Sequence, residues 1–292
     1  SNVAVGRDAL GNNTTASANT AVGYQAGYSN TTGTENTFIG GAAGDAITTS
    51  NANTALGYLS LSAETSSNGN TAIGAEALKN QNVGGSGDAR NTAVGLLAGA
   101  NVSTGIQNTL IGALAGDAIT TASNNTAVGY QSLSANTTGT ANTAIGRNSL
   151  QANTTADDNT ASGMYSLYTN TTGASNTAHG RSALFSNTTG SSNVSVGAQA
   201  LENNTTASGN VAIGDNALRA YQTGGDNVVI GRNAGYTLNG NGNCTFLGRG
   251  SGFDTTGGNN TFVGYSSGSG VTSGAKNTIV GLYNGNQGGL DI

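Results

Sequence analysis

The chain has 292 residues and a net charge of −5, and only 8% of its residues are charged, whereas an ordinary globular domain has about 25%. With 48 glycines, no proline and one cysteine, it has neither the composition of a Pro-rich disordered chain nor an internal disulfide framework. It contains no basic patch and no apolar run of about 18 residues, which argues against nucleic acid as a partner and against membrane insertion.

A 17-residue repeat, N-T-A-V-G-x-x-A-L/G-x-x-N-T-T-G-x-x, organises the whole sequence. Fifteen of its sixteen spacings are 16 or 17 residues, and the spacing from Asn70 to Asn91 is four residues longer. A fixed period of this kind is typical of solenoids, in which each unit packs on its neighbours. We therefore predict one repeat domain of 17 coils over 1–292, with a loop insertion near 80–90. The first positions of the units are Asn2, Asn19, Asn36, Asn53, Asn70, Asn91, Asn108, Asn125, Asn142, Asn159, Asn176, Asn193, Asn210, Asn227, Cys244, Asn260 and Asn277.

Each unit begins with a predicted strand at its positions 2–4. Segments such as 126–128 and 278–280 are short, β-branched and bounded by Asn and Gly, which is typical of strands, whereas Gly, Asn and Thr are poor helix formers. A less regular stretch such as 131–134 predicts a second short strand, and N-T-T-G at 136–139 predicts a turn. The predicted fold class is all-β, a parallel β-solenoid or β-roll.

Positions 3 and 9 of the unit exchange volume. Every unit with Leu at position 9 has Ala or Ser at position 3, and every bulky residue at position 3 comes with Gly at position 9. A close-packed interior demands such compensation, so these positions are predicted to meet inside the coil. Two units, with Gly27 and Gly99, are small at both positions, and Tyr28 is expected to fill the first gap. Examples of the predicted coil interior are Ala127, Leu133, Ala144, Leu150, Phe246 and Phe262.

Position 4 then faces outward, because side chains alternate along a strand. It is aliphatic in fifteen of the seventeen units, and stacked coils would align these side chains into an apolar column. Soluble monomers rarely expose such a patch, so we predict a homotrimer that buries the column around a common axis. Gly at position 5 of every unit is expected at a sharp bend or close backbone approach there. The aliphatic column consists of Val5, Val22, Ile39, Leu56, Ile73, Val94, Ile111, Val128, Ile145, Val196, Ile213, Ile230, Leu247, Val263 and Val280.

Two single residues depart from these columns. His179, the only histidine, stands at position 4, so three copies would converge on a trimer axis as a candidate metal or anion site. The alternative is a polar interruption of the aliphatic column. Cys244 replaces the Asn of position 1 and is predicted to be a small buried substitute, with crosslinking between chains as the alternative.

The insertion and four tyrosines are candidate contact residues. Gly84, Gly85, Ser86 and Asp88 belong to the only insertion, which is predicted to form a loop, and loops on rigid scaffolds often carry contacts. Tyrosines at position 6 could stack on sugars or be ordinary surface residues. They are Tyr24, Tyr58, Tyr130 and Tyr265.

Two families share these motifs. N-T-A-V-G followed by small residues resembles the head repeats of YadA-like trimeric autotransporter adhesins. The fuller pattern N-T-A-V-G-Y-Q-S-L-S-A-N-T-T-G at 125–139 is similar to repeat regions of bacteriophage tail fibres, which is the closer resemblance. The resemblance implies a left-handed β-roll with three chains per head and the aliphatic residues on the trimer axis. The start at Ser1 and the closing segment 285–292 are expected of a fragment or a processed product.

Both families attach to surfaces, and neither implies catalysis. No cluster of acid, base and nucleophile recurs, so the chain is predicted to be no enzyme and to hold no cofactor. The predicted function is a structural and receptor-binding fibre segment, extracellular on a virion tail or a cell surface, whose receptor is a glycan or outer-membrane component. A bacterial adhesin head, a passive architectural spacer and an ice-binding solenoid with a Thr column at position 2 stay open as alternatives.

Overall fold

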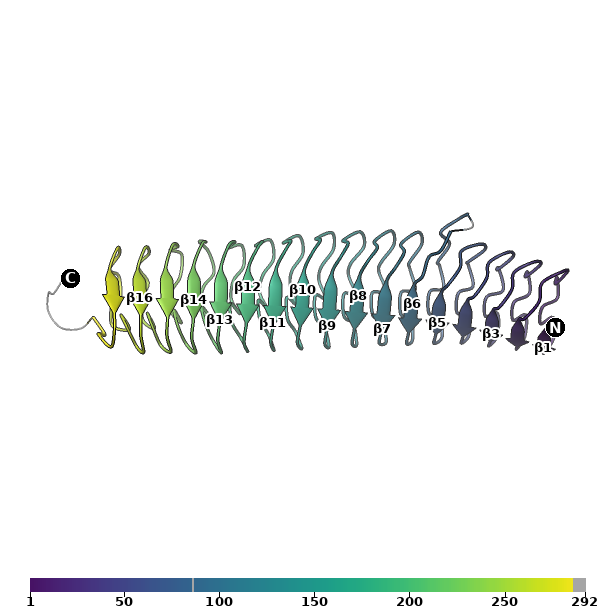
Figure 1. Ribbon diagram of the computed structural model, residues 1–292, viewed down its shortest axis with the longest axis horizontal. Helices are drawn as coiled ribbons and strands as arrows, with labels where there is room; N and C mark the ends of the chain where they lie inside the picture. Colours follow the sequence, from purple (N-terminus) through teal and green to yellow (C-terminus); the bar gives the residue numbers. More distant parts are fainter. Residues whose placement is uncertain (86, 286–292) are drawn as a thin grey trace. The chain divides into compact units, whose positions relative to one another are not determined.

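The computed structural model describes residues 1–85 and 87–285, and it divides into two units, 1–147 and 148–285, which we treat separately. Each unit is a stack of parallel three-residue strands joined by turns, without a helix among its described residues (Figure 1). The first unit contains β1 (Val3–Val5), β2 (Thr20–Val22), β3 (Thr37–Ile39), β4 (Thr54–Leu56), β5 (Thr71–Ile73), β6 (Thr92–Val94), β7 (Thr109–Ile111), β8 (Thr126–Val128) and β9 (Thr143–Ile145). The second contains β10 (Thr160–Ser162), β11 (Thr177–His179), β12 (Val194–Val196), β13 (Val211–Ile213), β14 (Val228–Ile230), β15 (Thr245–Leu247), β16 (Thr261–Val263) and β17 (Thr278–Val280).

Neighbouring strands pair in parallel and in repeat register within each unit. Thr20 pairs with Thr37 in the first unit and Thr160 with Thr177 in the second, so one repeat makes one coil. This confirms the all-β fold class and the parallel β-solenoid with a 17-residue repeat, while the single domain over 1–292 stays a prediction. In the part of the chain that the structure describes, no helix is long and apolar enough to cross a membrane.

Each coil contains one strand, so the predicted second strand is wrong. Positions 6 to 11 form turns, in which positions 7 and 9 take left-handed backbone angles, such as φ +54° at Leu59 and +52° at Leu61. Leu59 donates its N–H to the Gly41 carbonyl of the preceding coil, and Leu61 donates to the Ala77 carbonyl of the following coil. These bonds and the burial of Leu61 offset a conformational cost of about 1–2 kcal/mol per residue.

Glycine at position 5 marks where successive coils of one chain touch. A Cβ added to Gly40, at φ +134°, would lie 2.6 Å from the carbonyl oxygen of Gly57 in the next coil. Real Cβ atoms do not approach a backbone oxygen so closely, and this φ is one that other residues rarely adopt. The close backbone approach expected from the sequence is therefore found between coils of the same chain.

The interior of each unit is closely packed at positions 3 and 9. A Cβ on Gly44 would lie 2.5 Å from the Phe38 ring, and one on Gly116 would lie 2.7 Å from Leu110. All six residues given as examples of the predicted coil interior are fully buried: Ala127, Leu133, Ala144, Leu150, Phe246 and Phe262.

The two coils that are small at both positions make room for the next coil. A Cβ on Gly27 would collide with Phe38, and one on Gly99 would lie 2.6 Å from Leu110. The expectation that Tyr28 fills the first gap is wrong, because its side chain is 36% exposed. A Phe or Leu at position 3 thus needs Gly at position 9 of its own coil and of the preceding one.

Position 12, which the sequence assigned to a turn, is a further interior position. Asn30, Ile47, Glu64 and Tyr221 all occupy it and are fully buried. Ile47 lies against Gly44, since a Cβ there would be 3.3 Å from its Cδ1 atom. Position 12 therefore shares the interior volume with positions 3 and 9.

Position 1 forms a buried asparagine ladder in each unit. In the first unit, Asn36 donates its backbone N–H to Asn19 Oδ1 at 2.9 Å and its Nδ2 to the Ser50 carbonyl at 2.8 Å. In the second, Asn193 donates to Asn176 Oδ1 at 3.0 Å and to the Ala207 carbonyl at 2.8 Å. The side chains thus satisfy buried backbone groups on two coils at once.

Cys244 interrupts this ladder in the second unit. Its N–H donates to Asn227 Oδ1 at 2.9 Å, but its sulfur lies 3.7 Å from the Gly257 carbonyl oxygen, where an Asn amide would donate. Burial raises the pKa of the Cys244 thiol, and its side chain is 1% exposed. This burial favours the predicted role of a small buried substitute over crosslinking between folded chains.

A double-mutant cycle should test the rule for packing between coils. Gly27→Leu should lower the free energy of unfolding by about 1–3 kcal/mol because the new side chain meets Phe38. Phe38→Ala alone should lower it by about 3–5 kcal/mol through the cavity it leaves. In the double variant the Leu occupies that cavity. The decrease in its free energy of unfolding, measured by guanidinium denaturation, should therefore be well below the sum of the decreases in the two single variants. Additive losses would contradict the rule.

Restoring the asparagine ladder should stabilise the second unit. Cys244→Asn should raise the free energy of unfolding by about 1 kcal/mol, because the amide can donate to the Gly257 carbonyl and accept from the next coil. Cys244→Ala is the matched control and should bring no gain. A Cys244→Asn variant that unfolds at a lower guanidinium concentration than the parent would refute the ladder's role.

Candidate functional site

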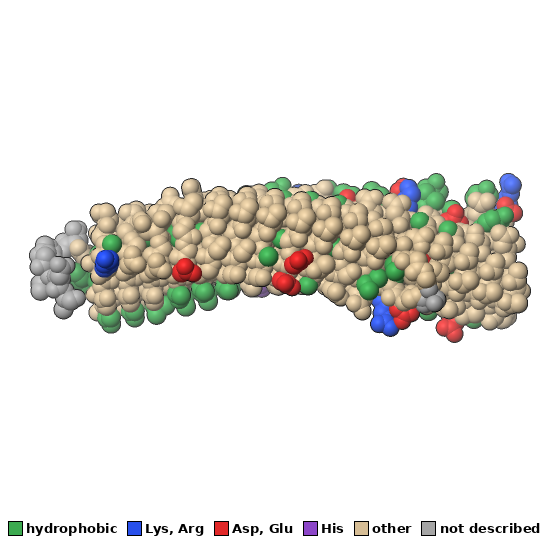
Figure 2. All heavy atoms as spheres, turned by 90° about the horizontal axis from the view of Figure 1, so that it is seen from above, with side chains coloured by type: hydrophobic (Ala, Val, Ile, Leu, Met, Phe, Trp, Pro, Cys, Tyr) green, Lys and Arg blue, Asp and Glu red, His purple; other side chains and the backbone are tan. Residues whose placement is uncertain are grey.

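The aliphatic column lies on the surface of both units. In β2 to β16 the middle residue is buried and the third points outward, so Leu56 and Ile230 are 43% and 39% exposed, and Val5 in the terminal strand β1 is 57% exposed. Figure 2 shows a row of hydrophobic side chains along the lower edge of the C-terminal part. The structure thus places the column where another chain can reach it, and its burial in a trimer stays a prediction.

His179 ends β11 within the same column and is exposed. It pairs in register with Ser162 on one side and Val196 on the other. Among the described residues of one chain, no group of three His, Cys, Asp or Glu side chains could hold a metal ion. An axial metal site at His179 would therefore require imidazoles from other chains.

The insertion forms the predicted loop between β5 and β6, which stands out in Figure 1. A Cβ on Gly84 or Gly85 would meet nothing within 4 Å, and Ser86 lies outside the described residues. Asp88 accepts a hydrogen bond from Asn68 at 3.3 Å and pairs with Arg90 at 2.6 Å, and both interactions lower the pKa of its carboxyl group. The loop's acidic group is thus already engaged.

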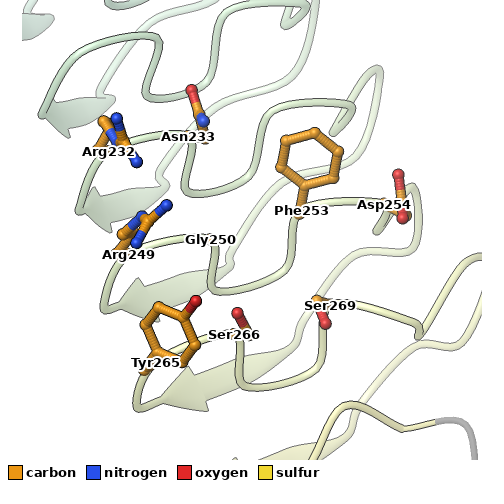
Figure 3. Close-up of a pocket in the computed structure, with 9 residues that line it drawn as sticks. All are labelled: Arg232, Asn233, Arg249, Gly250, Phe253, Asp254, Tyr265, Ser266 and Ser269. Atoms are coloured by element: carbon orange, nitrogen blue, oxygen red, sulfur yellow. The ribbon is translucent and has the colours of Figure 1, made fainter.

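A pocket in the second unit is a site that the sequence did not predict. Three consecutive coils contribute Arg232, Arg249 and Tyr265 at position 6 along one side, and Phe253 lies on the opposite side (Figure 3). The Arg249 guanidinium lies 5.6 Å from the centroid of the Tyr265 ring, a cation–π contact. The remaining lining residues are Asn233, Gly250, Asp254, Ser266 and Ser269.

Phe253 ends a column of aromatic side chains at position 10 of the second unit. The Tyr168 and Phe185 rings stack with centroids 5.1 Å apart, and Tyr236 and Phe253 stack at 5.2 Å. These four residues form what we call the aromatic column.

Polar side chains occupy position 10 in the two coils between the stacked pairs. Arg219 pairs with Glu202 at 2.6 Å and donates to the Tyr236 hydroxyl at 3.3 Å, and the bond to Glu202 is the main reason that the pKa of Arg219 is raised. The position-10 side chains are thereby ordered along this face of the second unit.

A comparison of the residues at the same repeat position in successive units would have revealed this site. The two arginines are 17 residues apart at position 6, and the aromatic residues recur at position 10. All four tyrosines singled out at position 6 are exposed, but only Tyr265 lines the pocket.

Neither a scan of protein-family models nor a search of curated proteins finds a match to this chain. The resemblance to bacteriophage tail fibres and to adhesin heads therefore stays a prediction.

Proposed function

We propose that the chain is a structural and receptor-binding segment of an extracellular homotrimeric fibre that mediates attachment to a host or cell surface. The exposed aliphatic column is the observation that carries this proposal. A bacteriophage tail fibre with a left-handed β-roll is the specific form that the sequence resemblance favours.

The column has the properties of a surface that sister chains cover. It presents one aliphatic side chain per strand at nearly every strand of both units, at a rung spacing of about 4.8 Å. Burial of apolar surface is worth about 25 cal/mol per Å², so many rungs add up to a strong association. Equivalent columns of three identical chains can meet around one axis, which leaves no apolar edge in water.

The remaining faces of each coil are suited to display. Turn positions 6, 7 and 10 carry residues that vary from coil to coil, while the ladders beneath them repeat. A rigid scaffold with variable side chains can hold many weak contacts toward a surface, and such contacts sum by multivalency.

Charged residues in the aliphatic column should break the trimer. Ile213→Asp combined with Ile230→Asp should shift the molar mass from three chains to one in light scattering coupled to size exclusion, because each trimer would bury six carboxylates in two layers. Thr189→Asp combined with Thr206→Asp is the matched control. It adds the same charge at exposed positions of the same unit, away from the column, and should stay trimeric.

A β-rich circular dichroism spectrum must be retained by both double variants. A parent chain with the mass of a monomer, or a folded Ile213→Asp/Ile230→Asp variant with the mass of a trimer, would refute the proposal.

A further inference from the structure

We infer that the pocket between the coils of β14, β15 and β16 binds a sugar that carries a carboxylate, an inference that names the receptor class of the proposed attachment function and rests on it. The site takes one saccharide unit against Arg232 and Arg249, with Phe253 and Tyr265 at its sides (Figure 3).

The two arginines form the only pair of like charges that occupy the same position in consecutive coils of this chain. Stacked coils bring equivalent positions to about 4.8 Å at the backbone, so two like charges at such positions lie close enough to repel each other. A fold with so few charges could readily avoid this repulsion. An anion placed between the two guanidinium groups removes it.

Both guanidinium groups are available to a ligand. Arg232 and Arg249 are exposed and form no ion pair with any described carboxylate, whereas Arg7, Arg90 and Arg219 each have one. Asp215 stands one coil before Arg232 at the same position, but it pairs with neither arginine and accepts from Asn216 at 3.2 Å. Guanidinium groups bind carboxylates with two parallel hydrogen bonds, and the contact with Tyr265 holds Arg249 in place beforehand.

The remaining lining groups match a sugar ring. Phe253 is fixed by its stacking on Tyr236 and offers an apolar surface for the C–H groups of a pyranose. Asn233, Ser266 and Ser269 line the same pocket with side chains that form no hydrogen bond to another described residue, so they can bind hydroxyl groups. Ligand sites commonly combine apolar walls with a few such polar groups.

Asp254 decides between carboxylate and phosphate. With two guanidinium groups and one carboxylate, the pocket has a net charge of +1. This charge matches a single carboxylate, while the Asp254 oxygens can accept hydrogen bonds from sugar hydroxyls. A phosphate monoester, which carries close to two negative charges at neutral pH, would leave the pocket with a net charge of about −1, whereas one carboxylate neutralises it.

The test uses a matched pair of ligands on the purified full chain. Oligogalacturonate should bind in isothermal titration, and its fully methyl-esterified form, in which each carboxylate is replaced by a neutral methyl ester on the same sugar backbone, should bind at least tenfold more weakly. Raising the salt from 50 to 500 mM should weaken binding of the acid form. Mannose 6-phosphate represents the phosphate class and should not compete.

Variants then locate the site. Arg232→Gln combined with Arg249→Gln should weaken oligogalacturonate binding about tenfold or more, since a charged hydrogen bond is worth about 1.5–3 kcal/mol. Arg181→Gln is the matched control, because Arg181 is another exposed arginine at position 6 of the same unit but does not line the pocket. It should bind like the parent.

Equal binding of the acid and ester forms, tighter binding of the phosphate sugar, or unchanged binding by the double Gln variant would overturn the inference. None of these results alters the trimer mass, which tests the fibre proposal separately. A trimer that binds cell surfaces equally well with and without the two arginines would refute the pocket and leave the fibre in place.

Discussion

Repeat-register stacking of coils is the constraint on which the rest of this structure depends. Because each strand pairs with its equivalent in the next repeat, every position of the unit becomes a column of spatial neighbours. Each residue must therefore fit the residues one repeat before and after it as well as those of its own coil. Gly at position 5 follows from this, since the backbones of successive coils touch there.

Hydrogen bonds between coils explain how such a polar sequence can fill an interior. The position-1 asparagines donate and accept within a buried ladder, and a second ladder in the second unit links Asn170 to Asn153 at 2.9 Å and Asn187 to Asn170 at 2.7 Å. Glu64 shows that even a buried carboxylate can be satisfied by such hydrogen bonds. Its buried Oε1 accepts from the N–H groups of Thr65, Ser66 and Ser67, and its Oε2 accepts from Gln81 at 3.1 Å. Most buried polar groups of this fold are tolerated because the next coil supplies a partner at a fixed distance, although a few atoms, such as Asn30 Oδ1 and Asn204 Oδ1, have none among the described residues.

The sequence predicted the features that depend on residue composition and repeat period. It did not predict those that depend on the backbone conformation of the turns. The strand at positions 2–4 and the exchange between positions 3 and 9 could be read directly, because β-branched residues and side-chain volumes carry that information. The second strand was wrong because residues such as Leu59 and Leu61 take left-handed angles, which Leu disfavours when considered alone. Phe38 reaches the space beside Gly27, and a comparison confined to one unit could not show this.

The same stacking limits where charge can be placed. In a globular protein, a surface charge can avoid its like-charged neighbours, but in a stacked coil the backbones of its nearest equivalents are fixed at about 4.8 Å. Opposite charges in one column attract, as Glu202 and Arg219 do at 2.6 Å, and a column of one sign repels itself. A low content of charged residues is thus a consequence of the architecture. By this argument, the adjacent arginines at 232 and 249 stand out as the one place where the sequence accepts a repulsion that the fold elsewhere avoids. The proposed carboxylate ligand would account for this exception, because an anion between the two guanidinium groups removes the repulsion.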